Sequence, residues 1–142
     1  MVIKIFIDTD VIISSLISQS GAAHLLLNQT KNLKLYVSNI SIYEIDEVTR
    51  RLNLDIKKQK NLIINNFSQV IIKEEIKELK TFFADYVLDS NDAHIVAGAK
   101  KSHSQFLISY NTKHFRINKL KENFNIILAT PANLLQYLRS IK

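Results

Sequence analysis

The strongest constraint on the fold of this chain is its first apolar segment, which runs directly into a carboxylate. The segment Val2 to Ile7 reads Val-Ile-Lys-Ile-Phe-Ile, and Asp8 follows it. A run this rich in β-branched and aromatic residues is typical of a strand buried on both faces in a parallel sheet. Open α/β sheets bind ligands in the crevice beyond the carboxyl ends of such strands. Asp8 is therefore the first candidate for a functional site.

After this segment, predicted helices and predicted strands alternate along the chain. Further strands are predicted at 33–37, 70–72, 106–109 and 125–128, and helices at 11–17, 22–28, 41–52, 54–67, 74–83, 93–101 and from Pro131 onward. This alternation implies an α/β fold whose parallel strands are joined by right-handed crossovers. No repeat, low-complexity tract or Pro/Gly-rich linker interrupts it, so we expect residues 1–142 to form a single domain.

The composition is that of an ordinary soluble globular protein. Of its 142 residues, 46% are hydrophobic and 23% are charged. The absence of cysteine excludes a disulfide framework and a thiolate metal site. No apolar run reaches the length of a membrane span, and the first residues lack the pattern of a signal peptide. We therefore expect a cytoplasmic location and no membrane partner.

The net charge gives a weaker indication of the partner. The formal charge is +6 and the isoelectric point is about 9.5, which favours a polyanionic partner, above all nucleic acid. The excess is mostly lysine spread along the chain, and Lys57, Lys58 and Lys60 also fit the solvated face of one helix. The charge alone leaves both interpretations open.

Several acidic or amide side chains fall at predicted strand ends or helix starts, and they form the candidate site. They are Asp8, Glu44, Asp89, Asp92 and Asn111. Gathered carboxylates repel one another, so they need a counter-charge. Hard oxygen ligands without cysteine or a histidine triad select Mg²⁺ or Mn²⁺ rather than zinc. Such an ion activates water and stabilises the leaving oxygen of a phosphodiester.

Some of these residues also have a structural interpretation. Ser41-x-x-Glu44 has the spacing of a capping box, in which Glu44 would only bond the backbone at a helix start. Asp89 and Asp92 fit the cap and the first-turn acid of the following helix. A structural interpretation is weaker for Asp8, because an acid that ends a doubly buried strand is expected to have little structural work to do.

Four segments, in this order, resemble the motifs of PIN-domain ribonucleases. They are FIDTDVII at 6–13, SIYEI at 41–45, DSNDAHIVAGA at 89–99 and FLISYNTKHF at 106–115. Their order and spacing cover nearly the whole chain, which makes the resemblance specific although each motif is weak. The relatives that the chain most resembles are bacterial PIN proteins classed as toxins of toxin–antitoxin pairs.

The resemblance implies a three-layer α/β/α sandwich with a central, mostly parallel sheet of four to five strands. It also implies a ribonuclease that uses Mg²⁺ or Mn²⁺. Lysines around the cleft are expected to bind the RNA backbone. Carried over by position, Asp8, Glu44 and Asp92 are the metal ligands, and Asp89 is a supporting acid. A homodimer and an antitoxin partner are expected on the same basis.

The fourth motif departs from the family pattern. Many members have an aspartate where this chain has Asn111 or where it has His114. An amide at position 111 can orient ligands or water but supplies no charge. Neither His114 nor His94 is predicted to be a metal ligand, and both are expected at the surface or at a helix cap.

The sequence therefore predicts a metal-dependent endoribonuclease and leaves two alternatives open. The departure in the fourth motif motivates a catalytically inactive PIN-like module that binds RNA or a partner protein. Asp8-Thr9-Asp10 also fits an aspartate-nucleophile phosphohydrolase, in which Asp8 forms an aspartyl-phosphate and Asp10 acts as the acid. The lysine and further acids that haloacid-dehalogenase-like enzymes need have no convincing match in this sequence.

Overall fold

The fold is built on a five-stranded sheet in which all paired strands are parallel. The structure is a computed structural model and describes residues 2–29 and 31–141. The strands are β1 (Ile3–Ile7), β2 (Leu33–Ser38), β3 (Phe67–Val70), β4 (Phe106–Ile108) and β5 (Ile127–Ala129), in the order β3-β2-β1-β4-β5. The first strand is central, as its apolar sequence predicts.

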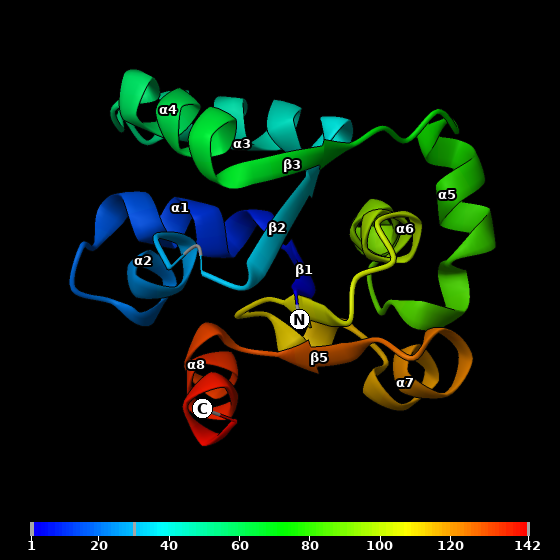
Figure 1. The fold of residues 1–142 in the computed structure, drawn as a ribbon. Coiled ribbons are helices and arrows are strands. Elements are labelled where there is room, and N and C mark those ends of the chain that lie inside the picture. Colours follow the sequence, from blue (N-terminus) through cyan, green and yellow to red (C-terminus); the bar gives the residue numbers. More distant parts are fainter. Residues whose placement is uncertain (1, 30, 142) are drawn as a thin grey trace.

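Helices cover both faces of this sheet (Figure 1). They are α1 (Thr9–Ile17), α2 (Ala22–Leu27), α3 (Asn39–Arg51), α4 (Ile56–Asn66), α5 (Ile76–Phe82), α6 (Ala93–Lys101), α7 (Ile117–Phe124) and α8 (Pro131–Ser140), with short 3-10 helices at Ala84–Tyr86, Ser90–Asp92 and Thr112–His114. Helices α1, α2 and α8 lie on one side of the sheet and α6 and α7 on the other, which confirms the three-layer α/β/α architecture. None of the helices in the described ranges is long and apolar enough to cross a membrane.

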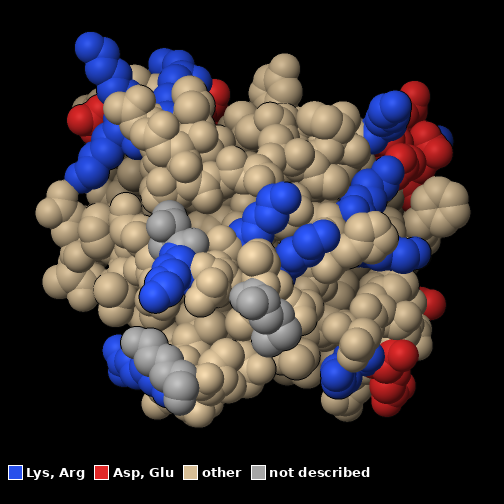
Figure 2. Space-filling model, viewed as in Figure 1, with Lys and Arg blue, Asp and Glu red and all other residues tan. Residues whose placement is uncertain are grey.

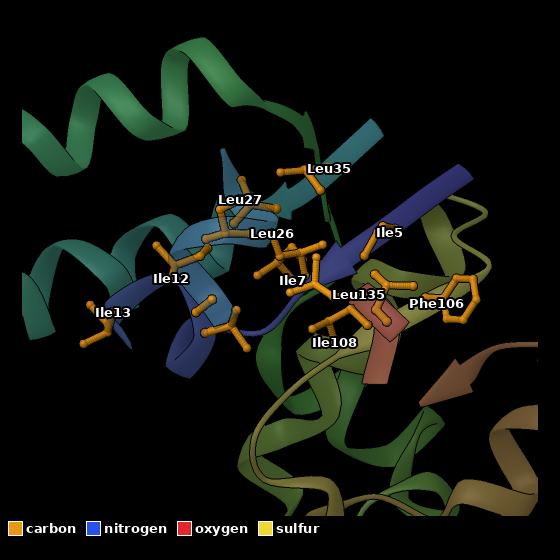
Figure 3. Packing of buried hydrophobic residues seen from close by; sticks show 14 of the residues in the cluster. Ile5, Ile7, Ile12, Ile13, Leu26, Leu27, Leu35, Phe106, Ile108 and Leu135 are labelled. Carbon is orange, nitrogen blue, oxygen red and sulfur yellow. The ribbon is translucent and has the colours of Figure 1, made fainter. Parts of the chain in front are cut away.

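Successive side chains of β1 enter two different hydrophobic clusters. Ile5 and Ile7 point into a cluster with residues of α1, α2 and α8, such as Ile12 and Leu135 (Figure 3). Phe6 points to the other face, into the cluster that includes residues of α6. This alternation follows from the period of two in a strand. Burial on both faces explains why the strand is apolar almost throughout.

Helix α6 packs against β1 unusually closely, and a glycine makes this possible. A β-carbon at Gly98 would overlap the ring of Phe6, which is fully buried. The close approach fixes α6 against the strand that precedes Asp8. Because α6 begins at Ala93, directly after Asp92, the packing of this helix on β1 helps to bring Asp92 near enough to Asp8 for their charges to interact.

The predicted strand at 70–72 is wrong in its boundaries, because β3 covers Phe67–Val70. Strand β2 ends at Ser38, which pairs with Val70, so β3 has no residue of β2 to pair with beyond Val70. The side chain of Asn39 takes over at this point: its Oδ1 accepts from the backbone N–H of Ile72 at 2.8 Å, and its Nδ2 donates to the carbonyl of Ile72 at 3.1 Å. Helix α7 was not predicted.

Candidate functional site

Asp8 lies at the carboxyl edge of the sheet, where β1 meets β4. The order of the strands reverses here, since β2 lies on one side of β1 and β4 on the other. Asp8 is the N-cap of α1, so the expectation that it has little structural work to do is wrong, and it is only 8% exposed. Its Oδ1 accepts from the backbone N–H of Thr9 at 2.7 Å, and its Oδ2 accepts from the hydroxyl of Ser109 at 2.8 Å. The side chain is thus fixed at the crevice where α/β sheets bind ligands.

Asp10 joins Asp8 from the first turn of α1. Its Oδ2 accepts from the backbone N–H of Tyr110 at 3.0 Å and lies 3.5 Å from the hydroxyl of Ser109. Its Oδ1 is buried and has no hydrogen-bond partner among the described residues. Ser109 therefore lies between two carboxylates, and its Oγ also accepts from the backbone N–H of Asn111 at 3.0 Å.

Glu44 reaches the same region from the second turn of α3. Its Oε1 accepts from the hydroxyl of Thr9 at 3.2 Å, and its Oε2 lies 3.1 Å from Nε2 of His94. The capping-box interpretation is wrong because α3 begins earlier: Ser38 is its N-cap and accepts from the backbone N–H of Ser41 at 3.0 Å. The carboxylate of Glu44 is therefore free of the helix start and faces the site.

His94 lies in the interior, so its expected place at the surface is wrong. It belongs to the buried helix α6 and is 6% exposed. Its Nδ1 is buried without a hydrogen-bond partner in the part of the chain that is described. With Nε2 beside Glu44, an N–H on Nε2 donates to the carboxylate. His114 is exposed, as expected, and its Nδ1 also lies 3.4 Å from Oδ2 of Asp92.

The two acids of the third motif differ in their surroundings. Asp92 is half-buried at the start of α6, makes no capping hydrogen bond and lines the central cavity. Asp89 is exposed, and its Oδ1 accepts from the backbone N–H of Asn91 at 2.9 Å, as expected for a cap. Asp89 does not line the cavity, whereas Asn111 does.

One cavity of about 620 Å³ brings most of these side chains together. Its lining consists of Asp8, Thr9, Asp10, Ile13, Ser14, Ile17, Glu44, Glu47, Val48, Arg51, Asp92, His94, Ile95 and Asn111. Four of the five predicted site residues are in this set, and no lysine is among these described residues. The expected lysine grip on a substrate is therefore not part of the cavity wall, where Arg51 is the only Lys or Arg among the described residues. On the face shown in Figure 2, Lys and Arg side chains are scattered and do not gather in one patch.

Burial raises the pKa values of the three aspartates that line the cavity, Asp8, Asp10 and Asp92, and like charge adds to the shift in Asp8 and Asp92. Burial, and then the charges of Asp10 and Asp92, raise the pKa of Asp8 to about 7, although the hydrogen bonds from Ser109 and Thr9 oppose the shift. Burial also raises the pKa of Asp10. Burial, followed by the charge of Asp89, raises the pKa of Asp92, whereas His114 lowers it. A positive charge bound among these groups would relieve their repulsion.

Comparison with known proteins identifies the family. The profile of the PIN domain matches residues 4–113, a span that includes every candidate residue named above. The chain belongs to the PIN-domain family. Among curated proteins no sequence match was found.

Solved structures share the PIN fold. A crystal structure of VapBC2 from Rickettsia felis, bound to a DNA fragment from its promoter, superposes with a TM-score of 0.62 at 16% identity, covering 90% of this chain and 98% of that one. A toxin–antitoxin complex from Klebsiella pneumoniae superposes with a TM-score of 0.60 at 20% identity, covering 89% of this chain and 96% of that one. At these identities the likeness establishes the fold.

The donor atoms of this PIN domain fit a hard divalent cation. The available ligands are carboxylate oxygens, and Oδ1 of Asp10 is buried without a hydrogen-bond partner among the described residues, whereas Oδ2 of Asp92 has only His114 nearby, at 3.4 Å. Within residues 2–29 and 31–141, no group of three or more acidic or histidine side chains is placed so that it could hold a metal ion by itself. Mg²⁺ suits such an open arrangement, because it commonly keeps several waters and takes one or two carboxylates together with substrate phosphates.

Three features of the site were missed at the level of sequence. The sequence interpretation assigned Asp10 only to a phosphohydrolase, although its position two residues after Asp8 places it at the same end of the strand. Ser109 ends the predicted strand at 106–109, so its place beside Asp8 follows from adjacent parallel strands. His94 gave no signal, since the direction of a helical side chain depends on how the helix packs.

Proposed function

We propose that this PIN domain is a Mg²⁺- or Mn²⁺-dependent endoribonuclease that hydrolyses RNA phosphodiester bonds. The observation that carries the proposal is the convergence of Asp8, Asp10, Glu44 and Asp92 on one cavity at the carboxyl edge of the sheet. Membership of the PIN family supports nuclease chemistry, and the formal charge of +6 favours a nucleic acid as the partner. The same membership argues against the aspartate-nucleophile phosphohydrolase.

In this proposal Asp8, Glu44 and Asp92 hold the cation, and Asp10 adds negative charge beside Asp8. The bound cation would activate water and offset the negative charge that develops on the phosphate. The raised pKa of Asp8 means that the cation competes with a proton for this carboxylate near neutral pH. Metal affinity is therefore expected to rise as Asp8 loses its proton.

The remaining residues of the cavity position these acids and the substrate. Thr9 and His94 bond opposite oxygens of Glu44 and so fix the plane of its carboxylate. Ser109 and the backbone N–H of Thr9 bond opposite oxygens of Asp8 and fix its carboxylate in the same way. Asn111 would orient a phosphate oxygen or a water through its amide, and Asp89 would act only through its charge on Asp92.

We also propose that the protein is the toxin of a toxin–antitoxin pair, with an antitoxin partner and a homodimeric state. The support is the fold shared with VapBC2 of Rickettsia felis and with the toxin–antitoxin complex of Klebsiella pneumoniae. An antitoxin that binds over the cavity would restrain the nuclease in the cytoplasm. Co-expression with the product of a neighbouring gene, followed by measurement of complex mass and nuclease inhibition, tests this part.

The first prediction is that purified protein cleaves single-stranded RNA in Mg²⁺ or Mn²⁺ and that Asp8→Asn and Asp92→Asn each lower the rate. Loss of a cation ligand is expected to reduce the rate by about a hundredfold or more, the equivalent of about 2.7 kcal/mol in the barrier. Gel analysis of an end-labelled RNA measures the rate. Asp85→Asn is the matched control, because Asp85 is exposed and lies outside the cavity.

Two outcomes would contradict the nuclease proposal. Unchanged cleavage in excess chelator, or in both folded variants, would remove the assigned roles from the acids. RNA affinity that is unchanged by chelator, with no cleavage under any condition, would support the inactive binding module instead. Circular dichroism and thermal melts must show that the variants are folded before either comparison is made.

A further inference from the structure

The central cavity has a second half that the acids do not account for. Helix α1 contributes a stripe that begins at Asp10 and ends at Ile17, and α3 contributes a stripe that begins at Glu44 and ends at Arg51. Both stripes have the helical spacing of i, i+3/i+4 and i+7. Two helical turns, about 10.5 Å, therefore separate the acidic end of each stripe from its outer end.

The outer half of the cavity combines an apolar surface with one permanent positive charge. Its apolar residues are Ile13, Ile17 and Val48, and Ile17 is 62% exposed although it is a large aliphatic side chain. Among the residues that the structure describes, Arg51 is the only Lys or Arg of the lining, which also contains five acids. Within the described ranges its guanidinium has no ion-pair or hydrogen-bond partner, so its donors are available to a ligand.

A polyanion needs such a group in order to enter this cavity. The acids of the cavity repel the phosphates of a nucleic acid. The cation proposed at the inner end offsets this repulsion only for the phosphate that lies beside it. Arginine keeps its charge at every relevant pH and bonds a phosphate with two parallel N–H groups. An exposed aliphatic wall next to it can cover the face of an unpaired base or a ribose.

We propose that this outer half binds the nucleotide next to the scissile phosphate of single-stranded RNA. This proposal rests on the nuclease function proposed above. Arg51 holds the neighbouring phosphate, and Ile17, with Ile13 and Val48 behind it, packs against the sugar or base. The strand must be unpaired, because a base within a duplex cannot present its face to the protein. The cavity then selects single-stranded RNA by shape and charge.

RNA affinity measured in a background that cleaves slowly tests the role of Arg51. Asp8→Asn serves as this background, and fluorescence anisotropy follows a labelled single-stranded oligoribonucleotide over a KCl series at constant Mg²⁺. Arg51→Gln should weaken binding by about tenfold or more. It should also lower the slope of log affinity against log salt by about 0.7, the value for one lost phosphate contact in single-stranded RNA. Arg50→Gln is the control, because Arg50 is exposed on the same helix but does not line the cavity.

The apolar wall makes a different prediction in the same assay. Ile17→Ser should weaken binding by about fivefold through lost apolar contact, without a change in the salt slope. Ile64→Ser is its control, because Ile64 is more exposed than Ile17 and lies on α4 away from the cavity. Thermal melts of all variants establish that the fold is retained.

The outcomes separate this proposal from the nuclease function itself. Equal effects of Arg51→Gln and Arg50→Gln would indicate diffuse attraction and overturn the assignment of Arg51. Unchanged RNA affinity in both Arg51→Gln and Ile17→Ser, with cleavage still dependent on Asp92, would overturn the proposal and leave this wall for a partner protein. Binding that depends on Arg51 and Ile17 in a protein without cleavage would uphold the RNA site and overturn the nuclease.

Discussion

At the scale of single residues, Asp8 has two tasks with opposite consequences for stability. As the N-cap of α1 it accepts a backbone hydrogen bond from Thr9, which stabilises the helix start. As a site acid it is buried beside Asp10, and its raised pKa shows that the hydrogen bonds it accepts do not compensate for burial and repulsion. The charge that the proposed chemistry needs is thus held at a cost to the apo fold.

Asn111 offers a direct test of the fourth motif. Asn111→Asp adds a carboxylate to the cavity lining, and it should tighten Mn²⁺ binding by about tenfold, the equivalent of about 1.4 kcal/mol. Isothermal titration calorimetry measures the affinity. Asn118→Asp is the control, because Asn118 is exposed on α7 outside the cavity. An unchanged or weaker affinity in Asn111→Asp would mean that this side chain does not face the cation.

His94 is predicted to act on the cation through Glu44. His94→Leu removes the contact to Oε2 of Glu44 while keeping an apolar body, and it should weaken Mn²⁺ binding by about tenfold to a hundredfold. His94→Gln keeps an N–H donor and should recover much of the affinity. Calorimetry on the folded variants measures both. Equal affinities in His94→Leu and wild type would show that Thr9 alone is sufficient to orient Glu44.

The site residues differ in how far the sequence predicts them, and the difference is physical. Asp8 follows from local pattern, since a carboxylate after a buried strand needs no tertiary information. The contact between Glu44 and His94 joins residues 50 positions apart, and it depends on how α3 and α6 pack. The sequence predicts Arg51 only as a residue near the end of a helix, because its place on the cavity wall depends on how the helices pack.

At the scale of elements, the boundaries that failed are those decided by a neighbouring element. Residues 70–72 are strongly apolar, but β3 stops at Val70 because β2 has already turned into α3 and Asn39 binds the backbone of Ile72. The start of α3 likewise lies at Asn39, because Ser38 supplies the cap that the pattern assigned to Ser41. Apart from α7, local propensity predicted the strands and α-helices of the described residues, and tertiary partners set their ends.

The close packing of α6 on β1 predicts a large effect of one methyl group. Gly98→Ala should lower the free energy of unfolding by about 1–3 kcal/mol, because its β-carbon would overlap the ring of Phe6. Chemical denaturation measures the loss. Gly21→Ala is the control, since a β-carbon there meets its nearest atom at 3.5 Å. Phe6→Leu in the Gly98→Ala background should recover part of the loss, and additive effects would refute the contact.

At the scale of the whole molecule, the topology follows from the sequence more securely than any boundary. Strands separated by helices imply parallel pairing, and the order β3-β2-β1-β4-β5 leaves β1 in the centre, as its largely apolar sequence predicts. The motifs of the PIN family then fall at one edge of the sheet. Even α7, which was not predicted, lies away from this edge and does not contribute to the cavity.

The raised pKa values make the stability of the apo protein depend on pH in a defined direction. Between about pH 4 and about pH 7, Asp8 binds a proton in the folded state but not in the unfolded chain, so stability must fall as pH rises through this range. Asp10 and Asp92 shift in the same direction. With rising pH, the free energy of unfolding of wild type should fall more steeply than that of Asp8→Asn. The two slopes should differ by at most about 1.4 kcal/mol per pH unit, the value for one proton. Urea denaturation in chelator measures both slopes.

At neutral pH the same repulsion should make folding and cation binding oppose each other. Asp8→Asn removes one buried charge at nearly constant shape, so it should raise the melting temperature of the apo protein, whereas loss of a purely structural cap charge would lower it. Mn²⁺ at about a hundred times its dissociation constant should stabilise wild type by about 2.7 kcal/mol and Asp8→Asn much less. Asp85→Asn, exposed and outside the cavity, should behave as wild type in both melts. If Asp8→Asn instead melts below wild type in chelator and Mn²⁺ shifts neither protein, the acids serve the fold alone, and the proposed nuclease loses its physical basis.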